Sequence, residues 1–328
     1  MIKTNYLKFS FILLYLVFLL VVFYVRFQGI AIRPMHCDEA NQAYKTGILL
    51  EKGIYKYDPH EHHGPLLYYA TLPILYLYNV HLFKDTDETM FRIVPLLFSL
   101  LLFLALIPVK KHIGTIAFWV SSILLAVSHA FFFYSRYYVH EIPFVLFSCL
   151  FVFLAWYYLN NQNLLTIIFL GITLSLSFAT KETTVIVLFS TCVSIMITHL
   201  FMSNTVGYVE NVQIQKVCTF SFKKVFQQTL CFLIAFLIPW LFLYSSFFTN
   251  GHGLVDFFKA YRTYLFRASG EGFSGIHDKP WWYYLEILTY FNKTVGPVWS
   301  EGFILLLCAI GVISFLILAF RIIIKKKC

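Results

Sequence analysis

The sequence predicts an all-α polytopic membrane protein, a bundle of about eight transmembrane helices with an outer juxtamembrane helical loop. Hydrophobic residues make up 59% of the 328 residues and charged residues only 12%, whereas about a quarter of the residues in a soluble domain are charged. The mean hydropathy is +0.74. These values exclude soluble, disordered and coiled-coil proteins. Seven cysteines without a C-x-x-C pair predict neither a disulfide framework nor a zinc site.

Eight apolar runs approach the twenty residues that a helix needs to cross a bilayer. They cover residues 8–27, 91–109, 113–133, 142–160, 164–180, 183–201, 228–247 and 301–320. The first run is longer than the apolar core of a signal peptide and lacks a small-residue cleavage site, so we expect it to remain as the first span. A ninth run, 65–81, is short, contains Pro65 and Pro73 and is rich in tyrosine. This composition predicts a helix at the level of the lipid headgroups.

The distribution of charge predicts the topology. If 65–81 does not cross the membrane, one side receives 11 of the 25 basic residues and a single acid, Glu210, a balance of +10. The other side receives the remaining bases and 15 of the 16 acids. Because short basic loops stay cytoplasmic, we expect both termini inside and the loops 28–90 and 248–300 outside. The basic excess then indicates membrane orientation and contact with anionic lipids, and it predicts no nucleic-acid partner.

We expect residues 1–328 to form a single transmembrane domain whose chemistry lies on the outer face, where the acids gather. The first outer segment follows the first span directly, and Asp38 and Glu39 stand there at the start of a predicted helix. A helix N-terminus favours an ionised carboxylate, so one of these acids is a candidate base. The alternative is an ordinary pair of helix-start acids, because acids are common in first turns.

A second outer segment, 60–63, reads His-Glu-His-His and concentrates ligand types that suit a divalent metal. Glu61 and His63 belong to it. The segment has no fixed helical spacing, so solvated loop histidines are the alternative interpretation.

Two further outer turns carry single cations. Arg136 and Glu141 belong to a turn that reads S-R-Y-Y-V-H-E, and such groups at a membrane boundary usually have partners or serve a pathway. The alternative is an interfacial ion pair that anchors the turn. Lys181, in the next outer turn, suits a phosphate but also suits simple snorkelling to the interface. His277 precedes a Trp-Trp-Tyr-Tyr run of the kind found in interfacial aromatic belts.

The order of these segments resembles a known superfamily of enzymes. A D-E pair, an H-G-P-L-L-Y-Y segment, the S-R-Y-Y-V-H-E turn, an A-T-K-E turn and an H-D-K-P-W-W-Y-Y loop follow one another within residues 5–290. This order resembles the GT-C glycosyltransferases, and among them the family 39 group of protein O-mannosyltransferases and lipid A aminoarabinose transferases. The H-G-P-L-L-Y-Y and A-T-K-E segments are most similar to an archaeal and bacterial branch named for flippase-associated activity.

The resemblance implies a reaction and a set of site residues. Family members transfer a sugar from a polyprenyl-phosphate-linked donor to a protein or lipid acceptor on the extracytoplasmic face, here of a bacterial or archaeal cytoplasmic membrane. Matching positions make Asp38, its neighbour Glu39 and Glu141 the catalytic acids. His277 matches a metal-binding histidine of the aminoarabinose transferases, and His63 lies near the place of their metal-binding acid.

The residues themselves suit a hexosyltransferase of this kind. A departing polyprenyl phosphate needs nearby positive charge, from Lys181, Arg136 or a divalent metal ion held by His63, His277 and Glu61, and an acceptor hydroxyl needs a base, for which Asp38 is the candidate. No nucleotide-binding motif occurs, so no nucleotide cofactor is expected. Two alternatives stay open: a transporter or flippase for lipid-linked sugars, and a noncatalytic partner in surface glycan assembly. A transporter should show inverted repeats or ionisable groups at the midplane, and the spans show neither.

Overall fold

The computed structural model describes residues 2–60, 63–203, 222–268, 279–292 and 298–325. In this part of the chain all regular elements are helices, apart from an isolated bridge between Phe291 and Trp299. Apolar spans are expected to be helical, because a helix satisfies every backbone N–H and C=O group within its own segment. The helices are α1 (Ile2–Phe27), α2 (Cys37–Lys52), α3 (Leu66–Leu77), the short 3₁₀ helix η1 (Phe83–Asp85), α4 (Glu88–Leu106), α5 (Lys110–Ile113), α6 (Thr115–Val127), α7 (His129–Tyr134), α8 (Glu141–Asn161), α9 (Leu164–Phe178), α10 (Thr184–Ser203), α11 (Phe222–Tyr244), α12 (His252–Ala268), α13 (Tyr283–Thr289) and α14 (Gly302–Lys325).

Each of the eight expected spans coincides with one of these helices or with a pair of them. Within the described residues, five helices are long and apolar enough to cross a membrane: α1, α4, α8, α11 and α14. The apolar helices α6, α9 and α10 are shorter, with 13 residues in α6 and 15 in α9. The predicted class, an all-α polytopic membrane protein, is therefore confirmed, while the number of eight crossings stays a prediction.

The third expected span is not one continuous helix, as the sequence predicted, but two. α6 ends at Val127, and Ser128 leaves the helical conformation with a ψ of 123°. The Ser128 hydroxyl accepts a hydrogen bond from the Phe131 N–H and donates one to the Glu301 carboxylate. The same carboxylate accepts a bond from the Ala130 N–H. These bonds satisfy the backbone at the break, which is why a serine in an apolar run can interrupt the helix here.

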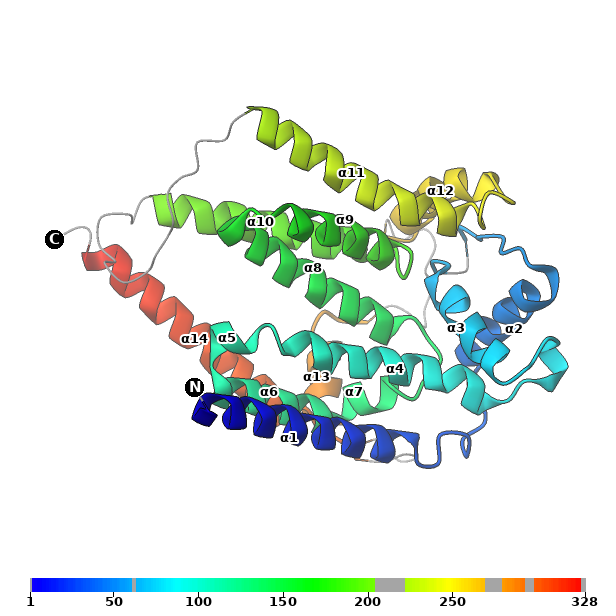
Figure 1. Ribbon diagram of the computed structural model, residues 1–328, viewed down its shortest axis with the longest axis horizontal. Coiled ribbons are helices and arrows are strands. Elements are labelled where there is room, and N and C mark those ends of the chain that lie inside the picture. The colour runs from blue at the N-terminus through cyan, green and yellow to red at the C-terminus, as the bar shows by residue number, and fades with distance from the viewer. Residues whose placement is uncertain (1, 61–62, 204–221, 269–278, 293–297, 326–328) are drawn as a thin grey trace.

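The helices run back and forth between two ends of the molecule (Figure 1). The beginning of α1 and the end of α14 lie at one end, and α2, α3 and α12 gather at the other. The beginning of α1 and the end of α14 thus lie on the same side of the bundle. That this side faces the cytoplasm stays a prediction from the charges. We refer to the end that carries α2, α3 and α12 as the α2 end.

The predicted juxtamembrane helix is α3, which is only 12 residues long and contains Pro73. Its Leu67 packs with Ala43 of α2 and with Phe91 and Val94 of α4 in one buried apolar cluster. α3 therefore belongs to the layer at the α2 end.

A close contact between α9 and α11 involves Gly171, in the middle of α9. A Cβ atom at this position would lie 2.6 Å from the Phe232 carbonyl oxygen of α11. Small residues allow helices to approach in this way in membranes, where packing rather than the hydrophobic effect drives association. α9 and α11 also contribute to the largest apolar cluster described, through Leu174 and Tyr244 among others. This core includes Phe178 and Ala179, just before the turn that holds Lys181.

Candidate functional site

Asp38 stands in the first turn of α2 with an accessible carboxylate. The residue before the helix, His36, caps it: the His36 side chain accepts a hydrogen bond from the Asp38 N–H, and the Glu39 side chain accepts one from the His36 N–H. The Asp38 side chain is 65% exposed, and its Oδ2 lies 3.4 Å from His36 Nδ1. The sequence-predicted base is thus placed where a substrate can reach it.

Glu39, the neighbour of Asp38, has a different environment. Its side chain is fully buried, and Arg92 Nε and Nη2 donate to its two oxygens at 2.8 and 2.9 Å. Arg33 Nη2 and the Tyr138 N–H donate as well, at 2.9 and 3.0 Å. Burial alone would raise the pKa of Glu39, but the bonds from Arg92, Tyr138 and His36 outweigh it and hold the pKa below its ordinary value. Every bond made by Glu39 is internal, so its catalytic role stays a prediction without a contact that supports it.

Arg92, at the start of α4, is a residue that sequence reasoning missed. Besides Glu39, its guanidinium donates to the backbone carbonyls of Ile30, Arg33 and Pro34. It therefore ties the loop after α1 to α4 and fixes the start of α2. A signal was present in the sequence, because a buried charge at the edge of an apolar span usually has a specific partner.

A second buried carboxylate, Glu182, lies in the turn between α9 and α10. Tyr57 donates a hydrogen bond to its Oε1 at 2.6 Å, and His63 Nδ1 lies 2.9 Å from its Oε2. Tyr264 of α12 also donates to Oε2, at 3.2 Å. Burial raises the pKa of Glu182, but the bond and charge of His63 and the Tyr57 bond hold it below the ordinary value. We call this group, His63 with Glu182, Tyr57 and Tyr264, the His63 cluster.

Backbone contacts hold the loop before α3 against the same turn. The Gly64 N–H donates to the Thr180 carbonyl at 3.2 Å, and the Leu66 N–H donates to the Ala179 carbonyl at 2.8 Å. A Cβ atom at position 64 would lie 2.3 Å from the Ala179 oxygen. Only glycine permits this approach, which explains the glycine of the H-G-P segment.

Glu141 and Lys181 form an ion pair on the accessible side of this turn. Lys181 Nζ lies 3.0 Å from Glu141 Oε1, and their side chains are 20% and 36% exposed. Glu141 opens α8 and Lys181 follows α9, so the structure brings together two predicted site residues that lie 40 positions apart.

Arg136 lies beside the Asp38 region. Its Nη2 donates to the Gln28 carbonyl at 2.6 Å, while its buried Nε has no hydrogen-bond partner among the described residues. Burial, and then the charges of Arg33 and Arg92, lower the pKa of Arg136. These three guanidinium groups form a local concentration of positive charge, which an anion would relieve.

The segment between α7 and α8, residues 135–140, joins the two regions. The Tyr137 ring lies 5.9 Å from the His36 ring and 4.9 Å from the Arg33 guanidinium carbon. Three residues later, His140 Nε2 donates to the Gly64 carbonyl at 3.1 Å, and its ring lies 5.3 Å from that of His63. The structure therefore places Asp38, Arg136, Glu141, Lys181 and His63 around one short segment.

The proposed metal ligands are only partly described. Glu61 and His277 lie outside the described residues, so the set of three stays a prediction. His63 itself fits a metal ligand, because a carboxylate on one ring nitrogen commonly orients the other nitrogen toward a metal. A second set of ligand atoms, on His36, Cys37 and Asp38, lies within 4.8 Å of one another on the surface. His36 already uses its Nδ1 to cap α2.

Comparison with known proteins was made on sequence and on structure. Residues 16–253, more than half of the chain, match the family model described as dolichyl-phosphate-mannose-protein mannosyltransferase. Comparison with curated protein sequences gave no match. Among solved structures, a chain of the S. cerevisiae protein O-mannosyltransferase Pmt1-Pmt2 complex bound to the sugar donor is similar, with 18% sequence identity and a TM-score of 0.45. The similarity covers 72% of this chain but only 34% of that one.

Proposed function

This chain belongs to the dolichyl-phosphate-mannose-protein mannosyltransferase family, and on that premise we propose that it transfers a sugar from a polyprenyl-phosphate-linked donor to a protein or lipid-linked acceptor at the extracytoplasmic face. The observation that carries the proposal is the convergence of an exposed carboxylate, Asp38, with the cations Arg136 and Lys181 around the segment 135–140. Sugar transfer from a lipid phosphate needs this combination, because a base must face the acceptor and positive charge must face the leaving group.

Asp38 is the group that we assign to the acceptor. Its carboxylate accepts the proton of the acceptor hydroxyl while the hydroxyl oxygen bonds to the anomeric carbon of the sugar. The bond between that carbon and the phosphate oxygen breaks, and its electron pair leaves with the polyprenyl phosphate. Glu39 and Arg92 position Asp38, because they fix the first turn of α2 against α4.

We assign the phosphate to Lys181 and Arg136. Lys181 is held by Glu141 in a partly exposed pair, so a phosphate that displaces the carboxylate gains the lysine at little cost. Arg136 contributes a planar guanidinium, whose geometry suits phosphate oxygens. His63, oriented by Glu182, faces the same region, and a divalent cation bound there would supply further positive charge to the leaving group.

The test is a transfer assay with the purified full chain in lipid vesicles and radiolabelled polyprenyl phosphate mannose as donor. We expect Asp38→Asn to lower turnover about a hundredfold or more, the usual contribution of a general base, with donor binding retained. Asp85→Asn, another exposed acid of the first outer loop, is the matched control and should transfer at the normal rate.

Two results would count against the proposal. Normal turnover in Asp38→Asn would remove Asp38 from the mechanism. Movement of lipid-linked sugar across the vesicle membrane, without transfer to any acceptor and regardless of Asp38, would identify a flippase instead.

A further inference from the structure

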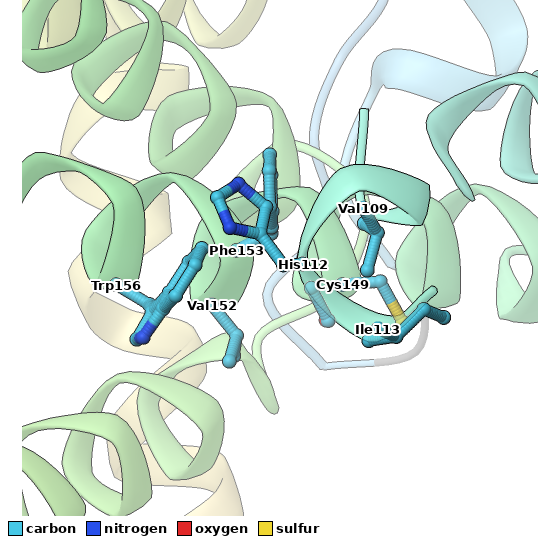
Figure 2. Close-up of a pocket in the computed structure, with 8 residues that line it drawn as sticks. Val109, His112, Ile113, Cys149, Val152, Phe153 and Trp156 are labelled. Atoms are coloured by element: carbon cyan, nitrogen blue, oxygen red, sulfur yellow. The ribbon is translucent and has the colours of Figure 1, made fainter. Parts of the chain in front are cut away.

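A hollow of about 520 Å³ opens between α5 and α8, far from the site described above (Figure 2). α5 lies near the chain ends, opposite the α2 end (Figure 1). The side chains that line the hollow come from α5, from the residue before it and from α8; they are Val109, His112, Ile113, Ser148, Cys149, Val152, Phe153 and Trp156.

The interior of this hollow suits a hydrocarbon chain. Apart from His112 and Ser148, its lining side chains are aliphatic, aromatic or thiol. The Ser148 hydroxyl is buried and has no hydrogen-bond partner among the described residues. From Ser148 to Trp156 the hollow follows α8 for about 12 Å, at 1.5 Å per residue. That length accommodates part of an acyl chain lying along the helix.

His112 lines the hollow, and the two lysines that precede it on α5 lie against aromatic rings. The His112 ring meets the Trp156 ring edge to face at 4.6 Å. Lys111 Nζ lies 4.9 Å from the centre of the neighbouring Tyr157 ring, and Lys110 Nζ lies 3.2 Å from that of Phe11 on α1.

These lysines lack acidic partners. In the described part of the chain every ion pair lies elsewhere, on α12 or among the groups of the α2 end. Two ammonium groups on α5, the helix that lines one side of the hollow, therefore lie against aromatic rings and pair with no acid among the described residues. An anion is the complement of their charge.

We propose that an anionic phospholipid binds here, with one acyl chain in the hollow and its phosphate against Lys111 and His112, next to Lys110. The polyprenyl donor of the proposed reaction is a different ligand, because its phosphate belongs at the α2 end. The bound lipid braces α5 against α8, where otherwise the ring contacts of His112 and the Lys111–Tyr157 contact join them.

Trp156 supplies a direct reporter of occupancy, because bromine atoms on an acyl chain quench indole fluorescence on contact. The full chain is placed in phosphatidylcholine bilayers that contain increasing fractions of brominated phosphatidylglycerol or brominated phosphatidylcholine. The difference between the wild type and Trp156→Phe isolates the signal of Trp156 from the other tryptophans. We expect half-maximal quenching of this signal at a lower fraction of the anionic lipid than of the zwitterionic one.

Lysine substitutions test the headgroup contact. A basic residue near an anionic membrane surface contributes about 1 kcal/mol, which corresponds to about fivefold in affinity. Lys111→Gln should therefore reduce the preference for phosphatidylglycerol about fivefold, and Lys110→Gln with Lys111→Gln should nearly abolish it. The matched control is Lys223→Gln with Lys224→Gln, at the beginning of α11, which should retain the preference.

Ser148→Leu tests the acyl contact independently of charge. The larger side chain fills part of the hollow, so quenching of Trp156 by both brominated lipids should fall, in a variant that elutes as a folded protein. Equal quenching by the two lipids in the wild type would overturn the proposal. So would a preference that survives removal of both lysines, or quenching that Ser148→Leu leaves unchanged. None of these measurements depends on sugar transfer.

Discussion

The protein buries two carboxylates at the α2 end, Glu39 and Glu182, and surrounds them differently. Glu39 is bound by the fixed charges of Arg92 and Arg33 and by backbone N–H groups. Glu182 is bound by tyrosine hydroxyls and by the imidazole of His63. Both have a pKa below the ordinary value, although burial alone would raise each.

The two carboxylates differ in whether their partners keep a free group for a further contact. Arg92 has no donor to spare, because its nitrogens bind Glu39 and three backbone carbonyls, so the Glu39 group is closed and fixes the fold. His63 is 30% exposed and uses Nδ1 on Glu182, which leaves Nε2 for a ligand. The His63 cluster is therefore open to chemistry. Asp38, the neighbour of Glu39, is the base of the proposed reaction, and the bonds of Glu39 fix the helix start on which it stands.

The largest expected effect comes from breaking the buried ion pair of Glu39 and Arg92. Arg92→Leu leaves the Glu39 carboxylate buried without its main counter-charge, and we expect a loss of about 3–5 kcal/mol in the free energy of unfolding. Thermal unfolding in detergent measures this, together with the yield of folded protein. Glu39→Leu combined with Arg92→Leu removes both charges and should be less damaging than Arg92→Leu alone. If Arg92→Leu were as stable as the wild type, the pair of Glu39 and Arg92 would not be what holds the first turn of α2 in place.

An intermediate effect is expected from removing the carboxylate charge of Glu182 from the His63 cluster. Glu182→Gln keeps the shape of the side chain and an acceptor for Tyr57 but removes the charge that orients His63. We expect turnover to fall roughly tenfold or more, the usual cost of losing a carboxylate that orients a functional histidine, with a smaller change in thermal stability. Asp256→Asn, which removes the acid of an exposed ion pair on α12, is the control and should be close to neutral. An equal loss of turnover in Glu182→Gln and Asp256→Asn would show that Glu182 matters no more than an ordinary surface charge.

The smallest expected effect is a change in how thermal stability depends on pH. A carboxylate with a depressed pKa contributes stability that is present above its ordinary pKa, 4.5, and is lost as the pH falls through the lower folded value. We therefore expect the wild type to lose thermal stability as the pH falls below about 4.5. Glu182→Gln, which no longer titrates at this position, should show a shallower decline, measurable as the melting temperature from pH 6 to pH 3. If the melting temperatures of the wild type and of Glu182→Gln fell by the same amount over this pH range, the depressed pKa of Glu182 would not contribute to stability.

Local patterns were sufficient to predict several parts of the molecule. Apolar runs located helices at all eight expected spans, because a span must satisfy its own backbone. Proline and tyrosine content predicted a juxtamembrane helix in 65–81; the structure has the short helix α3 there, and its place at the membrane surface stays a prediction. Asp38 and Glu39 were expected at a helix start, where the structure has them.

Contacts between distant residues could not be predicted in this way. Glu39 and Arg92 are 53 positions apart, and His63 and Glu182 are 119 apart. A local pattern shows that a side chain is charged, but not which element meets it, so Glu39 and Asp38 looked equivalent in the sequence. The break at Ser128 depends likewise on Glu301, 173 positions away. Glu61 and His277 lie outside the described residues, and their role as metal ligands stays a prediction.

The docking of Gly64 and Leu66 onto the turn after α9 constrains how the protein can be made. The ribosome must add 119 further residues after His63 before Glu182 exists, which takes about 6–24 s at 5–20 residues per second. For most of that interval the loop before α3 exists without the residues that accept its backbone hydrogen bonds. Those acceptors are the carbonyls of Ala179 and Thr180. The bond between His63 and Glu182 therefore forms only after α9 has been synthesised, and the Tyr264 bond waits for α12. The Glu39 and Arg92 pair can close as soon as α4 emerges.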